Sequence, residues 1–283
     1  MIDLHMHTTA SDGRCSPEEL VSRARGAGIT ALAVTDHDTM AAVPAAAAAA
    51  CRLGLEFLPG IEITSVSSGK DVHVLGYFLA PDSPGLSDLI SDQRRRRVER
   101  AREIGDRLAR MGAAIDVEAL VAAAAGGSGK AIARPQIAQA LIRAGHAGSV
   151  AEAFDRYLGE TCGAYVPHTG ASPVEVVALI RAGGGIASLA HPGYTKQDLV
   201  IPALVEAGLQ AIEAYHSSHD SDTTARYVAL AGRLDLAITG GSDYHGEGVR
   251  RAEFFGVTHL PDDQYLAFLD RAGTTRASLA RSV

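Results

Sequence analysis

The sequence predicts an α/β protein whose core is a barrel of seven β/α units, and three observations support this fold class. Short apolar segments of strand length alternate with longer segments of helical pattern along most of the 283-residue chain, which is typical of a parallel sheet covered by helices. Seven such units in one domain favour a closed or nearly closed barrel, and no G-x-G-x-x-G fingerprint of an open dinucleotide-binding sheet follows the first strand. Polar residues also collect at the strand ends, where such barrels place their active sites.

The first units have clear boundaries. The apolar start of the chain predicts a short buried strand. Ser16 is a suitable N-cap, Pro17 suits the first helical turn, and Glu19 completes a capping box for a helix that runs to Gly28. The apolar run 29–35 predicts the second strand, and an Ala-rich helix follows to about residue 54. Further strands are expected at 55–63, 71–78, 185–190, 209–215 and 236–239, with a possible additional one at 254–258, and further helices at 173–182, 198–207, 222–233 and 262–272.

Residues 83–164 interrupt this alternation. They contain helical patterns and no convincing strand, so we expect a small helical insertion between two barrel segments, 1–82 and 165–283. The expected helices are a long charged one through 93–100 and shorter ones at 116–125, 135–144 and 150–158. The segment Gly126–Lys130 is similar to a phosphate-binding P-loop, but it lacks the first Gly and the final Ser or Thr and follows no strand, so a flexible loop is expected there. The run Arg94–Arg97 is either a solvated helix face or a surface that steers a phosphate backbone.

Composition narrows the function classes. The net charge of −7 argues against stable binding to duplex DNA, which needs a basic face. An anionic substrate remains compatible, because bound divalent cations would reverse the local field. The three cysteines are widely spaced and form no zinc-ribbon or disulfide pattern, which favours a reduced, cytoplasmic setting. No stretch approaches the length of a membrane span, so no membrane association is expected.

The polar residues at the strand ends predict a metal site. His5 and His7 are two residues apart, so on a strand they would point to the same face, and Asp12 follows in the next loop. Histidine and carboxylate ligands without cysteine suit zinc, manganese or iron. There are too many candidates for one zinc ion, which takes about four ligands, and Glu62 could bridge two ions. The other candidates at or near strand ends are His37, His73, His191, His216, Asp243 and His245.

Six motifs, taken together, resemble the PHP (polymerase and histidinol phosphatase) family. They are His5-Met6-His7, Thr35-Asp36-His37-Asp38, Gly60-Ile61-Glu62, Asp71-Val72-His73, Ala190-His191-Pro192-Gly193 and Gly241-Ser242-Asp243-Tyr244-His245. They occur in the order of the family and cover nearly the whole chain. The resemblance implies a distorted seven-stranded β/α barrel, similar to a TIM barrel, with three divalent metal ions. It also implies that the insertion is a cap on the substrate side.

Carried over by position, the resemblance implies a ligand set for each ion. His5, His7, Glu62 and Asp243 would hold the first ion, Glu62, His73 and His191 the second, and Asp12, His37 and His245 the third. Within the family, the insertion is similar to that of nucleoside 3′,5′-bisphosphate phosphatases and of 5′→3′ exonucleases that act on short RNA. Arg134 matches their phosphate-contacting arginine, and His168, His216 and His219 match substrate-side positions. The family often has His where this chain has Gln136, which leaves the particular substrate open.

These observations lead to a mechanistic hypothesis. A hydroxide that bridges the two ions sharing Glu62 attacks the phosphorus of a phosphate monoester, with Asp243 and His191 in the catalytic centre. His219 or a metal-bound water then protonates the leaving oxygen. The expected substrate is a small phosphorylated molecule, a nucleotide or short 5′-phosphorylated RNA. The alternatives are a histidinol-phosphate-type phosphatase, an amidohydrolase acting on C–N bonds, and a metal-binding module without catalysis.

Overall fold

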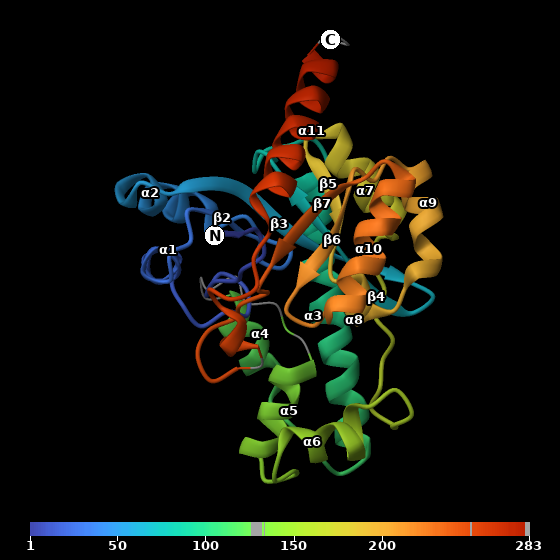
Figure 1. The fold of residues 1–283 in the computed structure, drawn as a ribbon. Coiled ribbons are helices and arrows are strands. Elements are labelled where there is room, and N and C mark those ends of the chain that lie inside the picture. Colours follow the sequence, from blue (N-terminus) through green and yellow to red (C-terminus); the bar gives the residue numbers. More distant parts are fainter. Residues whose placement is uncertain (126–131, 133, 250, 281–283) are drawn as a thin grey trace.

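Seven strands form one sheet in which every strand lies beside its neighbours in the sequence (Figure 1). The computed structural model describes residues 1–125, 132, 134–249 and 251–280, so the predicted loop at Gly126–Lys130 lies outside the described residues. The strands are β1 (Ile2–Asp3), β2 (Ala31–Val34), β3 (Glu56–Ser67), β4 (Lys70–Tyr77), β5 (Ile186–Leu189), β6 (Ala211–His216) and β7 (Ala237–Gly241). This confirms the predicted α/β class and its seven strands.

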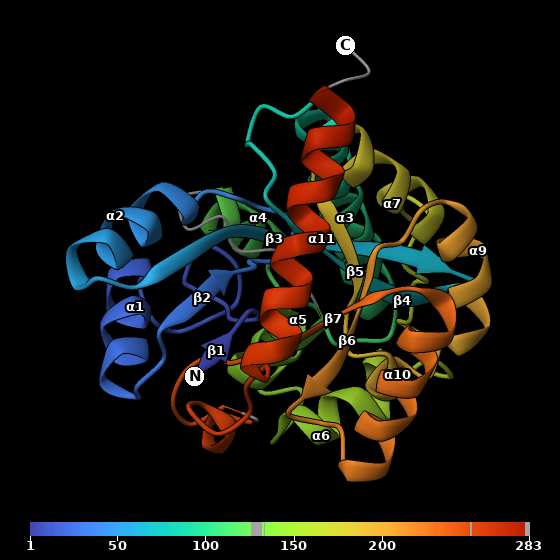
Figure 2. The same ribbon diagram turned by 45° about the horizontal axis from the view of Figure 1, so that its top comes forward.

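The first and last strands approach each other, so the sheet curves into a nearly closed barrel (Figure 2). The backbone N–H of Leu4 donates to the carbonyl of Gly240 over 3.0 Å, and Met6 forms a parallel bridge with Tyr244. β1 itself ends at Asp3, so His5 and His7 lie just beyond the regular strand in which we expected them.

The expectation of an all-parallel barrel was wrong at β4, which pairs antiparallel with both β3 and β5. Ser68 and Gly69 form the two-residue connection between β3 and β4, with φ of 51° and 76°. Positive φ at both turn residues is the conformation of a tight β-hairpin, which reverses the chain direction. β3 also extends five residues past Glu62, which therefore lies within the strand and not at its end.

Helices pack around the barrel and at its two ends (Figure 1). They are α1 (Pro17–Gly26), α2 (Val43–Leu53), α7 (Pro173–Ala182), α8 (Pro192–Thr195), α9 (Ile201–Glu206), α10 (Ser221–Leu234) and α11 (Asp262–Ala280). Ser16 caps α1 as predicted, because its side chain accepts from the backbone N–H of Glu19. The possible strand at 254–258 was wrong: Ala252–Phe254 is a short 3-10 helix and turns follow it. None of the helices in the described ranges is both long and apolar enough to cross a membrane.

The apolar core of the barrel lies toward the end opposite the insertion. Phe268 of α11 packs edge-on against Tyr77 of β4, with ring centroids 5.3 Å apart, and both side chains are fully buried. In Figure 1, α11 projects from the top of the barrel, whereas α5 and α6 hang below its lower end. The lower end is therefore the one available for polar chemistry.

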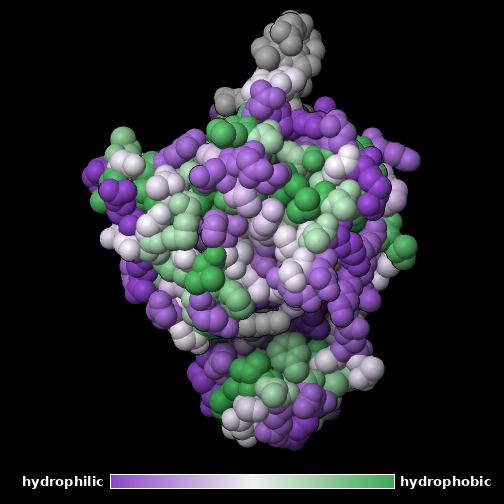
Figure 3. Space-filling model, in the orientation of Figure 1, coloured by the Kyte–Doolittle hydropathy of each residue, from purple (hydrophilic) through white to green (hydrophobic). Residues whose placement is uncertain are grey.

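All the regular secondary structure that is described within residues 83–164 is helical. It consists of α3 (Leu86–Arg110), α4 (Val117–Ala125), α5 (Arg134–Arg143), α6 (Val150–Ala153) and a π-helix at Phe154–Leu158. These helices have a small hydrophobic cluster of their own, which includes Ile104, Leu108, Ile137, Leu141 and Leu158. The long helix α3 links this cluster to the barrel. Figure 3 shows the insertion as a lower lobe set off from the barrel by a crease.

Candidate metal centre

Glu62 is the centre of the polar cluster. Its carboxylate is fully buried, and five imidazoles surround it. The Oε2 atom lies 3.1–3.3 Å from ring nitrogens of His5, His7 and His37, and Oε1 lies 2.7 and 3.0 Å from those of His73 and His191. One carboxylate oxygen thus faces three histidines and the other faces two, which is the arrangement expected of a carboxylate that bridges metal ions.

The strand register explains why these residues meet. His37 follows β2 and forms a parallel bridge with Glu62. The antiparallel hairpin places His73 opposite Thr64, two residues from Glu62 on the neighbouring strand. His191 follows β5, which flanks β4 on its other side. The reversal of β4 brings the beginning of that strand to the barrel end where the parallel strands finish, so His73 joins the cluster although it does not end its strand.

A second group lies beside Glu62 and contains Asp12. Candidate ligand atoms of His7, Asp12, His37 and His245 all lie within 4.8 Å of one another. Asp12 Oδ1 is 3.3 Å from His245 Nε2, and Asp12 Oδ2 is 3.9 Å from His37 Nε2. His7 therefore contacts both the Glu62 group and the Asp12 group.

Asp243 completes the cluster on the side of β1 and β7. Its Oδ1 atom is 3.5 Å from His5 Nε2 and 3.2 Å from His7 Nε2. His216, which we expected on the substrate side, forms a compact group with His5 and Asp243, and its Nε2 lies 3.4 Å from Asp243 Oδ2. The structure thus brings all nine predicted ligand residues together and places His216 among them.

The residues fit a set of divalent cations. His7 is fully buried, yet neither of its ring nitrogens makes a hydrogen bond within the described part of the chain. The same holds for Nδ1 of His37 and Nδ1 of His191. Buried polar atoms normally have partners, and imidazole nitrogens beside carboxylates are the donor set that zinc, iron and manganese prefer.

Electrostatics favour anionic carboxylates in the centre. Burial alone would raise the pKa of Glu62, but the imidazoles of His37, His73 and His5 outweigh burial and hold the pKa well below its ordinary value. The pKa of Asp243 is held well below its ordinary value in the same way. Burial would lower the pKa of His7, but the neighbouring carboxylates of Asp243 and Glu62 raise it to about 10. In the protein without metal, protons on histidine therefore offset the carboxylate charges that cations would otherwise neutralise.

Two acidic residues around the Asp12 group were not assigned roles from the sequence. Asp36 accepts hydrogen bonds from the backbone N–H of Thr8 at 2.7 Å and from the hydroxyl of Ser11 at 2.6 Å, which fixes the loop that carries Asp12. Asp38 accepts from the backbone N–H of Thr64 at 2.9 Å and from the guanidinium of Arg97. Of the run Arg94–Arg97, Arg97 thus reaches the site, whereas Arg95 and Arg96 pair with Asp92 on the helix surface.

Glu213 is the supporting residue that sequence reasoning missed entirely. It is fully buried within β6. Its Oε1 lies 2.9 Å from His5 Nδ1, and its Oε2 accepts from the backbone N–H of His191 over 2.8 Å. A carboxylate bound to the far nitrogen of a ligating histidine fixes the ring orientation and increases its basicity. The signal that could have identified it was a glutamate within a largely apolar strand.

The first prediction concerns this support. We expect Glu213→Gln to weaken divalent metal binding by about 10–100-fold, because outer partners of ligating histidines have effects of that size. Metal titration in the presence of a competing chelator measures the change. Glu206→Gln, an exposed carboxylate on α9, is the control and should bind metal like the wild type. Unchanged metal affinity of Glu213→Gln would contradict this role.

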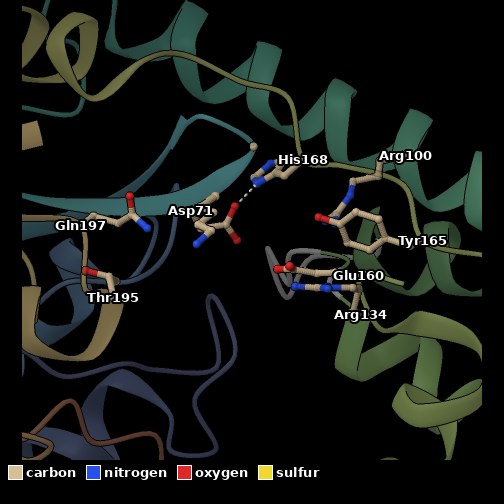
Figure 4. A pocket seen from close by; sticks show the side chains of 10 residues that line it. Asp71, Arg100, Arg134, Glu160, Tyr165, His168, Thr195 and Gln197 are labelled. Atoms are coloured by element: carbon tan, nitrogen blue, oxygen red, sulfur yellow. Dashed lines mark hydrogen bonds and ion pairs between the residues drawn. The ribbon is translucent and has the colours of Figure 1, made fainter. Parts of the chain in front are cut away.

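The cavities near the centre are lined by residues of both the barrel and the insertion. A cavity of about 700 Å³ is lined by His37, His73 and His245 of the centre and also by Arg100, Arg134 and His168. A smaller cavity of about 270 Å³ shares the last three residues. Figure 4 shows Arg100, Tyr165 and Arg134 on one side of the smaller cavity and Thr195 and Gln197 on the other.

His168 and His219 differ in what they offer a ligand. His168 Nδ1 lies 2.7 Å from Asp71 Oδ1, and its Nε2 is buried without a hydrogen bond among the described residues. The Nε2 atom of His219 accepts from the backbone N–H of Gly193 at 3.1 Å, and its Nδ1 lies 2.9 Å from the carbonyl of Ala214. Both ring nitrogens of His219 are therefore engaged, so its role as a general acid stays a prediction that these contacts do not favour.

This chain is similar in sequence and structure to several known proteins. Residues 3–104 match the family model described as PHP domain. The chain is 36% identical to a 3′,5′-nucleoside bisphosphate phosphatase of Chromobacterium violaceum over 262 residues, covering 88% of this chain and 89% of that protein. It is 34% identical to a 5′-3′ exoribonuclease of Haemophilus influenzae over 249 residues, covering 86% and 89%. A solved structure from Bifidobacterium adolescentis, described as a metal-dependent phosphoesterase, superposes with a TM-score of 0.83 at 32% identity and covers 95% of this chain and 96% of that one.

Proposed function

Because this chain belongs to the PHP domain family, we propose that it hydrolyses phosphate monoesters of nucleotides. The chain is a metal-dependent phosphoesterase, a hydrolase that acts on phosphoric ester bonds. The proposed substrates are nucleoside 3′,5′-bisphosphates or short 5′-phosphorylated RNA, by analogy with the named activities of its relatives. The observation that supports this choice best is the 700 Å³ cavity, which is lined by residues of the metal centre and by three arginines of the insertion. Its volume lies within the usual range for small-molecule sites.

Arg100 and Arg134 are suited to bind a second phosphate away from the metal centre. Among the described residues, Arg100 donates to the carbonyl of Val166 over 2.9 Å, and Arg134 donates to the carbonyl of Leu158 over 3.5 Å; neither donates to a carboxylate. Burial and the neighbouring charge of Arg134 lower the pKa of Arg100. Two neighbouring cations in a partly buried site favour an anion between them, and guanidinium groups bind phosphate in a bidentate manner.

The metal centre would act on the other phosphate. We assign three divalent ions, manganese, zinc or iron, to the nine residues brought together around Glu62, Asp12 and Asp243. When bound, such ions offset charge on the phosphoryl group and make water a stronger nucleophile at neutral pH. Glu213, Asp36 and Asp38 hold the surrounding side chains and loops in place. Asp243 and His191 belong to this catalytic centre.

The helical insertion, residues 83–164, is the proposed cap of the substrate site. It contributes Arg97, Arg100 and Arg134 to the cavity, whereas the barrel contributes the metal ligands. A substrate with two phosphates would therefore contact both parts of the molecule. In this proposal, the barrel carries out the reaction and the insertion selects substrates by their length and charge.

The second prediction tests this division. We expect Arg134→Ala to raise KM for a nucleoside 3′,5′-bisphosphate by about 10–100-fold, because a charge-assisted hydrogen bond contributes roughly 1.5–3 kcal/mol. KM for a simple phosphate monoester, which has no second phosphate, should stay within about twofold of wild type. Steady-state phosphate release on both substrates gives the two values. Arg143→Ala, at the exposed far end of the same helix, is the control. Equal losses on both substrates would show that Arg134 does not bind the second phosphate.

A substrate panel tests the proposed function itself. Purified protein with manganese is assayed on adenosine 3′,5′-bisphosphate, AMP, short 5′-phosphorylated RNA, histidinol phosphate and a cyclic amide. The proposal expects the bisphosphate or the RNA to have the highest kcat/KM. A strong preference for histidinol phosphate would reassign the substrate, and turnover of the cyclic amide alone would overturn the phosphoesterase function.

A further inference from the structure

Arg251 is a largely buried cation that lines the larger cavity and has no role in the function proposed above. It follows β7 in the loop after His245, and its side chain is only 11% exposed. It lines the larger cavity together with His37, His73 and His245. Its Nη1 donates to Asp243 Oδ2, and its guanidinium lies over the ring of Tyr194, 4.6 Å from the centroid. Arg251 therefore lies at the metal end of the cavity, beside a residue of the centre.

The two oxygens of Asp243 have different neighbours. Oδ1 lies 3.2 Å from His7 Nε2 and 3.6 Å from His245 Nδ1, which are both predicted metal ligands. Oδ2 faces Arg251 and His216. Arg251 thus contacts the oxygen that is directed away from His7 and His245, and it leaves Oδ1 to the predicted metal ligands.

Part of the hydrogen-bonding capacity of the guanidinium has no partner in the part of the chain that the structure describes. Within the described ranges, Nη2 of Arg251 makes no hydrogen bond. An arginine carries five N–H donors in a planar fork, and a buried donor without a partner is unfavourable. An anionic group with several oxygens, placed in the cavity, would supply acceptors to this fork.

The backbone around Arg251 is held in an unusual conformation. Arg251 has a φ of 72°, and positive φ also occurs at Asp38, His191 and Asp243 of the site. Residues other than glycine persist in this region when their surroundings over-determine it, and such residues cluster at functional sites. The loop is anchored by Arg14, which donates to the carbonyl of Glu247 over 3.1 Å, and by Tyr244, which donates to the Glu247 carboxylate over 3.2 Å.

We propose that Arg251 contacts the phosphoryl group that is hydrolysed, and this inference rests on the proposed function. In the reaction, a water oxygen forms a bond to phosphorus, the bond from phosphorus to the ester oxygen breaks, and a water proton ends on the leaving oxygen. Arg251 binds non-bridging oxygens of the group in flight and offsets their charge. Arg100 and Arg134 bind the other phosphate, so one arginine acts at the metal end of the cavity and two act at its insertion end.

Arg251→Gln and Arg251→Lys test this inference, with Arg233→Gln on the exposed face of α10 as control. Inorganic phosphate is the probe, and its binding to manganese-loaded protein is measured by titration calorimetry. Metal content and melting temperature are measured on the same samples. We expect Arg251→Gln to keep the metal content of wild type, to bind phosphate at least about tenfold more weakly, and to lose about 10²–10³-fold in kcat/KM, which is the usual effect of removing a charge-stabilising donor. Arg251→Lys should lie between Arg251→Gln and wild type. In a third variant, Arg251→Ala, the truncated side chain leaves space for added guanidinium ion, which should restore part of the activity.

Two outcomes would overturn the inference. Phosphate affinity equal to wild type in metal-loaded Arg251→Gln would show that Arg251 does not contact the phosphoryl group. A loss of activity that parallels a loss of metal would make Arg251 a positioning residue that acts through Asp243. Failure of the proposed function looks different: wild-type protein would then hydrolyse no nucleotide, whereas the phosphate titration would still compare Arg251→Gln with wild type.

Discussion

Glu62→Gln is expected to lower kcat/KM for a nucleotide substrate by more than about 10³-fold, which corresponds to roughly 4 kcal/mol of transition-state stabilisation. The reason is the position of the carboxylate: its two oxygens lie within 3.3 Å of five imidazoles. The neutral amide removes one negative charge from the centre and presents an NH₂ group where a cation would bind. We therefore expect metal content to fall together with activity, and elemental analysis of the purified variant measures it.

Glu56→Gln provides the matched control, because Glu56 is an exposed carboxylate on the same strand. It should retain the activity and metal content of wild type. Glu62→Gln with undiminished activity would remove Glu62 from the catalytic centre. Full metal content with lost activity would show that Glu62 acts in the reaction but is not needed for metal binding.

Removal of metal ions by a chelator is expected to abolish activity and to lower the melting temperature by several degrees. At a free ion concentration of about 100 times the Kd, binding stabilises the folded state by roughly 2.7 kcal/mol per site. In a protein of this size, a change of 1 kcal/mol shifts the melting temperature by about 2–4 °C. The buried groups of the centre include Glu62, Asp243, His5 and His7, so the loss of cations leaves several charges to be offset by protons alone. Differential scanning calorimetry and an activity assay before and after chelation measure both effects.

Addition of manganese should restore both properties in wild type. The same addition should stabilise Glu62→Gln much less, because that variant lacks the carboxylate shared by the histidines. Activity that survives exhaustive chelation, with melting unchanged, would contradict the metal dependence of this chain.

Local patterns were sufficient for most of the fold. The Ser16 cap and the apolar strands were correct because they depend on residues close together in the sequence. The direction of β4 was not, because the alternation of elements suggests parallel pairing by default. The pair Ser68-Gly69 between two apolar runs was the local signal of a hairpin. The reversal matters for function, since it brings His73 to the same barrel end as Glu62.

The candidate site was likewise predicted only in part. Histidines next to apolar strands were recognised, because a barrel topology brings strand ends together. Glu213 lies within a strand and Arg97 lies in a helix of the insertion. Neither is therefore at a strand end, which is where we expected the residues of the site. Arg251 approaches Asp243 through a loop whose path depends on contacts with Arg14 and Tyr244. Such tertiary contacts are not encoded in any short pattern, and the structure was needed to find them.

We conclude that the cluster around Glu62 makes this chain a metal-dependent phosphoesterase, and we propose nucleotides as its substrates. Release of inorganic phosphate from adenosine 3′,5′-bisphosphate by purified protein, with manganese and after chelation, tests it most directly. We expect one phosphate released for each bisphosphate consumed, a nucleoside monophosphate as the other product, and no release after chelation. Phosphate release that is independent of divalent ions, or none from any nucleotide in the presence of manganese, zinc or iron, would contradict it.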